Sequence, residues 1–255
     1  MRKYSLYLLI FLVALASCES KVDFTTPATP AGQTTDLMIS EISTAINTDP
    51  LASGARPHYV EIYNGTGSSK NLGDYAIGYF AVTDTFTLSN FSFNTATSFI
   101  LTGTLATGKC YVIASPQTDA VTIKRDTVWG TLSTTAANAS TPLQLSGNSG
   151  IALLKKDGAG THILNGNAYK VIDVFGSPLV GRVNSKGATS ARNNIIWTIA
   201  GETVDTRNRT FWRKANVTSP TTDWAAAKGT TAGDSQWTIS GDRAWSYLNI
   251  GLPTQ

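Results

Sequence analysis

Short runs of alternating apolar and polar residues recur along the chain, separated by turn residues. The clearest run covers residues 58–64, where Val60 and Ile62 alternate with polar or aromatic neighbours, as in a half-buried β-strand. Asn64-Gly65 follows as a turn, and Asp157-Gly158 is a hairpin signal. The pattern predicts strands within residues 37–42, 58–64, 71–80, 99–101, 108–114, 143–145, 150–156 and 170–176.

Long helical periodicity is absent, and this pattern favours an all-β fold. Many short strands joined by Gly, Asn and Asp turns are typical of a β-sandwich or barrel. Phenylalanines also alternate with polar residues between Phe86 and Phe93. The polar stretches 118–140 and 177–191 are expected to be long loops or insertions.

The N-terminus carries the three parts of a secretory signal. Arg2 and Lys3 precede an apolar run over Leu6–Leu15, and the small residues Ala16 and Ser17 end it. The run is about half of the ~20 residues that a membrane-spanning helix needs. We therefore expect residues 1–17 to be a signal peptide.

Cys18 determines which type of signal is expected. Leu15-Ala16-Ser17-Cys18 resembles the bacterial lipobox, which implies cleavage before Cys18 and lipid on its thiol. Glu19 is not the aspartate associated with inner-membrane retention, so we expect an outer-membrane lipoprotein of the cell envelope, periplasmic or surface-exposed. An ordinary signal peptide with an incidental cysteine is the alternative. Residues 18–36, rich in Thr, Pro, Gly and Ala, are predicted to form the lipidated end and a flexible tether.

Composition and charge narrow the function classes. The net charge of +3 is small and no dense basic run exists, so a nucleic-acid partner is not expected. Of the two cysteines, lipidation of Cys18 would leave Cys110 unpaired within an apolar run. We predict a buried free thiol there, and a domain that its core must stabilise without a disulfide.

Two strand carboxylates, Glu41 and Glu61, are the first candidates for chemistry because each has apolar neighbours. A buried carboxylate needs hydrogen-bond donors, so a role in fold stability is the first interpretation. The alternative is a cation site shared with Asp173 or Asp74. No Asp-rich loop with calcium-binding spacing accompanies them, so we predict no metal and no cofactor.

Enzyme motifs are scarce. His58 and His162 have no ligand partner at metal-binding spacing. The sequence holds no G-x-S-x-G elbow, P-loop or dinucleotide fingerprint. We therefore assign no catalytic residue.

Five of the six tryptophans, counting from Trp197, lie near the C-terminus. Aromatic rings serve cores and binding surfaces alike, so two interpretations stay open. The rings close one end of a sandwich, or they form a platform for sugars or a protein partner. The candidate platform comprises Trp212, Trp224, Trp237, Trp245 and Arg213.

The order of several segments resembles the lamin tail domain family. They are Met38–Ile42, Tyr59–Asn64, Asn71–Tyr75, Gly108–Ala114, Gly147–Leu153 and Val171–Gly176. The resemblance implies a compact immunoglobulin-like β-sandwich over residues 37–251. Residues 208–251 are similar to the Trp-rich C-terminal extension of secreted bacterial members, although Gln236 stands where Glu is common.

Together these features predict a membrane-anchored, exported, non-catalytic binding or structural module, an adhesion or adaptor protein. The lipid on Cys18 would bind the membrane, and the domain would bind a protein or glycan. The alternative is an accessory to, or part of, an extracellular hydrolase, a nuclease or glycan hydrolase, because lamin-tail-like domains accompany such enzymes.

Overall fold

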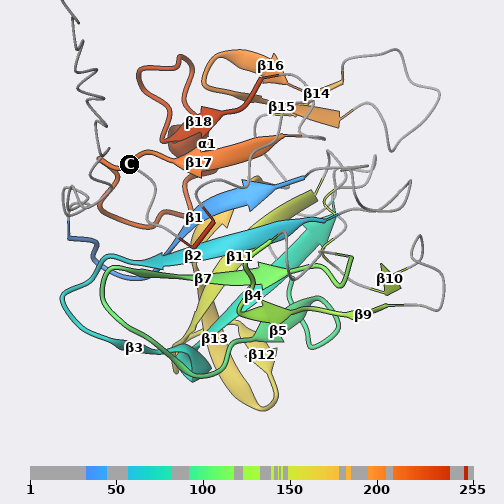
Figure 1. The fold of residues 1–255 in the computed structure, drawn as a ribbon, viewed down its shortest axis with the longest axis vertical. Coiled ribbons are helices and arrows are strands. Elements are labelled where there is room, and N and C mark those ends of the chain that lie inside the picture. Colours follow the sequence, from blue (N-terminus) through green and yellow to red (C-terminus); the bar gives the residue numbers. More distant parts are fainter. Residues whose placement is uncertain are drawn as a thin grey trace, which may run out of the picture.

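Two β-sheets form the layers of the molecule (Figure 1). The computed structural model describes residues 33–44, 57–81, 92–117, 123–132, 139–140, 143, 145, 149–177, 182–184, 195–204, 209–241 and 250–251. The first sheet has six strands, in the order β18 (Trp237–Ile239), β17 (Thr210–Arg213), β1 (Met38–Ser43), β2 (Tyr59–Asn64), β7 (Lys109–Ala114) and β8 (Thr127–Val128). Neighbours are antiparallel except β7 and β8, which run parallel.

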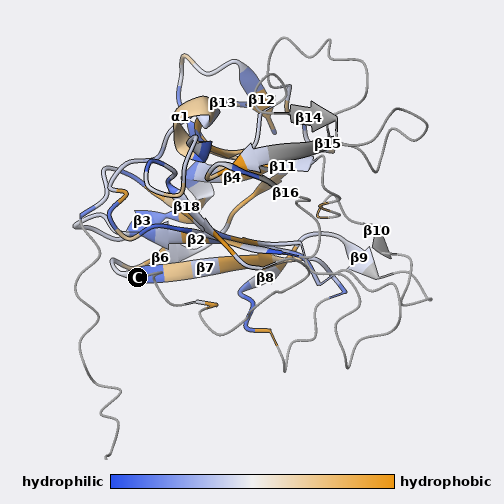
Figure 2. Cartoon of the chain, turned by 90° about the horizontal axis from the view of Figure 1, so that it is seen from above, coloured by the Kyte–Doolittle hydropathy of each residue, from blue (hydrophilic) through white to orange (hydrophobic). Residues whose placement is uncertain are grey.

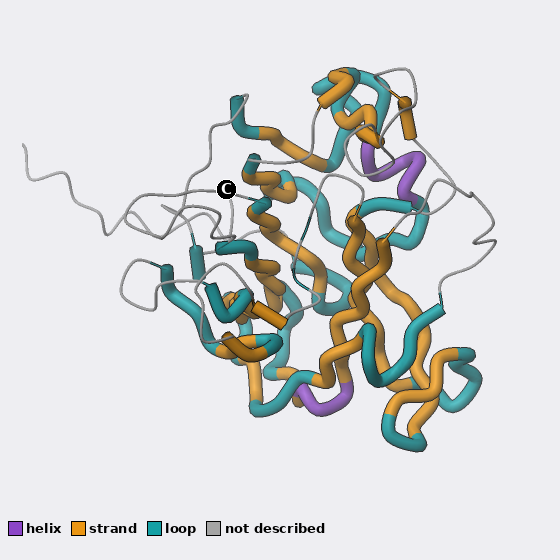
Figure 3. Tube along the Cα trace, turned by 90° about the vertical axis from the view of Figure 1, so that its right-hand side faces the viewer, coloured by secondary structure: helices purple, strands orange, loops and turns teal. Residues whose placement is uncertain are grey.

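The second sheet is antiparallel and has five strands. Its order is β12 (His162–Leu164), β13 (Asn167–Phe175), β11 (Ser149–Lys156), β4 (Tyr75–Ala81) and β5 (Ser98–Ile100). A small three-stranded sheet contains β14 (Arg182–Asn184), β15 (Ile195–Ile199) and β16 (Glu202–Val204). Two further sheets have two strands each: β3 (Lys70–Asn71) with β6 (Thr104–Leu105), and β9 (Thr131–Leu132) with β10 (Ala139–Ser140). Two short helices, η1 (Leu72–Asp74) and α1 (Trp224–Lys228), lie at opposite ends of the sandwich (Figure 3).

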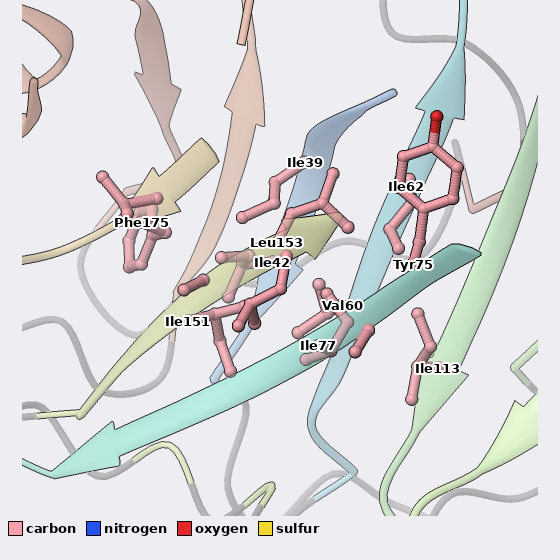
Figure 4. Packing of buried hydrophobic residues seen from close by; sticks show 14 of the residues in the cluster. Ile39, Ile42, Val60, Ile62, Tyr75, Ile77, Ile113, Ile151, Leu153 and Phe175 are labelled. Carbon is pink, nitrogen blue, oxygen red and sulfur yellow. The ribbon is translucent and has the colours of Figure 1, made fainter. Parts of the chain in front are cut away.

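The core lies between the two large sheets (Figure 4). Val60 and Ile62 of β2 point toward Ile77 of β4 and Leu153 of β11, and all four are fully buried. Each such side chain stabilises the fold by about 1.5–3 kcal/mol relative to exposure. In Figure 2 the hydrophobic colouring follows core strands such as β7, while β3 at the periphery is hydrophilic. The alternation in residues 58–64 therefore marks the core-facing side of β2 correctly.

A β-bulge in β1 explains why Ile39 and Ile42 share the core although they are three residues apart. The register with β2 shifts between Ile39 and Glu41, which makes Ser40 the extra residue. Regular alternation would have placed the two isoleucines on opposite faces. The bulge also leaves Ser40 and Glu41 together on the outer face.

The outer face of the six-stranded sheet is covered as well, which the alternation does not predict. Every residue of β1 and β2 is buried. Ile123 and Ile250 pack there with Tyr59, and Val217 packs beside a second small cluster that contains Cys110. The free thiol of Cys110 is buried, as predicted.

Strand predictions from the sequence hold for the central strands and fail in the polar stretches. Part of 118–140 is not loop: it contains β8, β9 and β10, and its residues Ile123 and Trp129 are buried. Likewise 177–191 contains β14, and β12 and α1 were not predicted. These elements are only two to five residues long, which is too short for local periodicity to reveal them. Residues 1–32, with Cys18, and residues 82–91 lie outside the described part.

Among the residues that the structure describes, no helix has the length and apolar character needed to cross a membrane.

Candidate functional site

The C-terminal tryptophans contribute to the core. Trp224 and Trp237 are 2% and 1% exposed, and their rings lie 5.2 and 5.1 Å from the ring of Phe175. Arg213, also buried, lies over the Trp237 ring with its guanidinium carbon 4.3 Å from the ring centre. An exposed platform is therefore the wrong prediction for these three residues. They fill the space between β13 and β17, so the core interpretation holds for them.

Of the remaining C-terminal tryptophans, the structure describes the side chain of Trp212 alone. Trp212 is half-buried in β17, opposite Glu41 of β1. Trp197 lies in β15, where its backbone pairs with Arg182 and Val204. Trp245 lies outside the described residues.

A buried ion pair joins the C-terminal extension to both sheets. Nη2 of Arg213 donates to both carboxylate oxygens of Asp173, at 2.6 and 2.5 Å. Asp173 also accepts the backbone N–H groups of Ile39 and Thr221, at 2.8 and 3.0 Å. Arg213 further donates through Nε to the carbonyl of Ile39 and through Nη1 to Gln236. Because these partners use both of its carboxylate oxygens, Asp173 has a structural role. It does not form a cation site with Glu41 or Glu61.

Glu41 and Glu61 face each other across β1 and β2, and both are fully buried on the outer face. Oε1 of Glu41 accepts the Tyr59 hydroxyl at 2.5 Å, whereas its Oε2 has no hydrogen-bond partner in the described part. Burial is the main cause that raises the pKa of Glu41 to about 8, and the charge of Glu61 adds to it; Tyr59 and Trp212 oppose the rise. Glu41 is thus protonated at neutral pH.

Glu61 holds distant segments together. Its Oε1 accepts the Ser40 hydroxyl at 2.7 Å and its Oε2 accepts the backbone N–H of Gly251 at 2.5 Å. Burial raises its pKa, while Ser40 and Gly251 act in the opposite direction. Burial and the adjacent Glu61 raise the pKa of the Cys110 thiol well above its ordinary value, so this thiol is a poor nucleophile.

The cation site considered from the sequence does not assemble. Asp173 is bound to Arg213, and Asp74 lies 3.9 Å from Lys156. No group of three or more His, Cys, Asp or Glu side chains in the described residues is arranged to hold a metal ion. His58 accepts the backbone N–H of Leu145 through Nδ1, and His162 packs against the ring of Phe93.

An open, mostly polar cavity of about 620 Å³, here called the β11–β13 cavity, is the candidate site. It is lined by Thr35, Asp36, Lys155, Lys156, Asp157, Lys170, Val171, Ile172, Pro220, Thr221 and Thr222. Two ion pairs frame it: Lys155 with Asp36 at 2.6 Å, and Lys170 with Asp157 at 2.5 Å. In the sequence, the cavity is indicated only by the adjacent pair Lys155-Lys156, just before the turn Asp157-Gly158. Asp36 and Thr221 are far from this pair along the chain, so the sequence does not show that they lie beside it.

Comparison with known proteins agrees with the observed fold. A family model described as Lamin Tail Domain matches residues 30–176, which is more than half of the 255 residues. No curated protein and no solved structure gives a match. Lamin tail domains are non-enzymatic, immunoglobulin-like domains, and two packed antiparallel sheets are consistent with that fold. The chain therefore belongs to the lamin tail domain family, as its strand motifs predicted.

Proposed function

We propose that this chain is an exported, lipid-anchored and non-catalytic binding or structural module of the bacterial cell envelope. Leu15-Ala16-Ser17-Cys18, at the end of a short apolar run, is the observation that carries the proposal. Lipid on Cys18 would hold the domain at the membrane, and several acyl chains make such attachment durable. Membership of the lamin tail domain family supports the part of the proposal that describes a binding or structural domain.

The way the chain enters the sandwich supports an anchored arrangement. Thr34 donates its N–H to the carbonyl of Gly65, and Thr35 donates to the carbonyl of Thr218. Asp36 accepts hydrogen bonds from Lys155 and from the hydroxyl of Tyr75. Thr35 and Asp36 also line the β11–β13 cavity. An anchor on the preceding segment would keep this cavity close to the tether.

Nothing in the described part favours the alternative of a hydrolase. Glu41, Glu61 and Asp173 have no exposed surface, so a substrate does not reach them in this structure. The adhesion or adaptor role, with a protein or glycan as partner, is the function we retain.

Anchoring is tested by expressing the full chain and its Cys18→Ser variant in a bacterial host. Wild-type protein should sit in the membrane fraction, with an intact mass that shows cleavage before Cys18 and added acyl chains. The C18S protein should lack both the lipid and that cleavage. Cys110→Ser is the matched control, because this buried thiol should not affect processing. Wild-type protein without lipid on Cys18 would overturn the proposal.

A further inference from the structure

We propose that the β11–β13 cavity binds an extended peptide segment that carries an acidic side chain, through main-chain pairing with the outer edge of β13. This inference rests on the proposed function and names the ligand of that binding module. An open strand edge is a template on which another extended chain can add. Its evidence is the sheet pairing, the shape of the cavity and the charges that line it.

The outer edge of β13 is paired at its beginning and near its end, but not between. β12 pairs with the first part of β13, and its last rung joins His162 to Tyr169. Further along, Val174 donates its N–H to the carbonyl of Thr221. Between these two points, no strand in the described part of the chain pairs with this edge. Residues 170–172 line the cavity instead.

The local geometry of β13 suits an incoming strand of a few residues. The register with β11 shifts so that Leu154 pairs with Val171 and Leu153 with Asp173, which leaves Ile172 as a bulge residue. Bulges often adjoin binding sites because they redirect side chains and interrupt pairing. The open stretch of four residues from Lys170 to Asp173 spans about 13 Å at 3.3 Å per residue. The cavity of about 620 Å³ lies in the range of ligand-binding clefts.

The lining charges favour an acidic side chain on the peptide. The cavity is lined by three lysines and two aspartates, which leaves one net positive charge. The side chain of Lys156 is 38% exposed, and its nearest carboxylate, Asp74, is as far as 3.9 Å away, whereas Lys170 already contacts Asp157 at 2.5 Å. A carboxylate on the peptide would gain a charge-assisted hydrogen bond from Lys156.

Other ligand classes fit the cavity less well. None of its lining residues is aromatic, so it offers no ring on which a sugar could stack. Lys155 and Lys170 already contact carboxylates at 2.6 and 2.5 Å, which neutralises much of the charge that a free phosphate would need. By contrast, the unpaired main-chain groups of a strand edge can form hydrogen bonds with the backbone of an extended peptide.

The test uses the full-length chain in mild detergent and a fluorescein-labelled peptide, Thr-Val-Glu-Val-Thr, blocked at both ends. Fluorescence anisotropy should show saturable binding below about 1 mM. Hydrogen–deuterium exchange should show new protection at residues 170–172 and 220–222. A peptide N-methylated at both valines, which lacks two main-chain donors, should bind at least about tenfold more weakly. Replacing Glu by Lys in the peptide should also weaken binding.

Two variants complete the test. Thr222→Trp fills the cavity from an exposed position and should abolish binding while the melting temperature is unchanged. Lys109→Ala, in β7 and away from the cavity, is the control and should bind like wild type. No binding at about 1 mM, equal binding of the N-methylated peptide, or full binding by T222W would each overturn the proposal. None of these outcomes bears on lipid attachment at Cys18, so this proposal and the anchoring proposal fail separately.

Discussion

At the residue scale, buried charge is handled in two different ways. Asp173 stays paired because Arg213 and two backbone N–H groups surround it. Glu41 is buried, accepts the Tyr59 hydroxyl and faces the carboxyl group of Glu61, so it keeps its proton at neutral pH. Neutralisation by protonation is the expected response of a carboxyl group that is buried without a cation.

The proton on Glu41 predicts a pH dependence of stability. The unfolded carboxyl group ionises near 4.5 and the folded one near 8, so between these values the folded state holds a proton that the unfolded state lacks. The free energy of unfolding should therefore fall as pH rises through this window, by up to about 1.4 kcal/mol per pH unit, and level off above it.

Glu41→Gln should reduce this slope, because Gln carries no titrating proton and has a similar size. Its stability relative to wild type should be greatest at pH 8 and shrink toward pH 5. Urea unfolding across this range measures it, and Glu202→Gln, at an exposed position, is the control. An unchanged slope in E41Q would show that Glu41 is ionised in the folded protein.

The Arg213–Asp173 pair predicts a large loss on single substitution. Asp173→Asn leaves the buried guanidinium without its counter-charge, which costs about 3–5 kcal/mol. Asp157→Asn removes the partly exposed partner of Lys170 and should leave the melting temperature nearly unchanged. Thermal unfolding of both variants gives the comparison, and similar melting temperatures for the two would contradict the prediction.

At the element scale, the C-terminal extension is part of the sandwich and not an appendage. The family match ends at residue 176, yet β17 pairs with β1 and β18 pairs with β17 in the same six-stranded sheet. Asp223 caps α1 by accepting the N–H of Ala226, and that helix brings Trp224 into the core. The extension thus covers an edge of β1 that residues 30–176 alone would leave open.

Removing the extension should therefore unfold the domain. A chain that ends after residue 208 loses Phe211, Trp224 and Trp237, each worth about 2–3 kcal/mol by burial, together with Arg213. This loss is comparable with the whole stability of a typical domain, about 5–15 kcal/mol. Circular dichroism should show no cooperative melting. A chain that lacks only residues 253–255 is the control, and cooperative melting of the shorter chain would refute the prediction.

At the scale of the whole molecule, the first described residues and the candidate site lie together. Thr35 and Asp36 line the β11–β13 cavity and are bonded to Thr218 and Lys155. Glu61 meanwhile holds Gly251, near the C-terminus, against the outer face of the first sheet. Ile123, Val217 and Ile250 pack on that same face, so β1 and β2 are buried on both faces.

The sequence by itself determined the strand periodicity, the turns, the lamin tail motifs and the buried thiol of Cys110. These follow from local alternation and short motifs, whose physical cause lies within a few residues. It did not determine that Trp224 and Trp237 are core, that a bulge at Ser40 lets Ile39 and Ile42 share one face, or that Lys170 and Thr221 line a common cavity. Only the tertiary structure decided these, because burial and pairing depend on segments far apart in the chain. Local periodicity does not show which distant segments pack against each other.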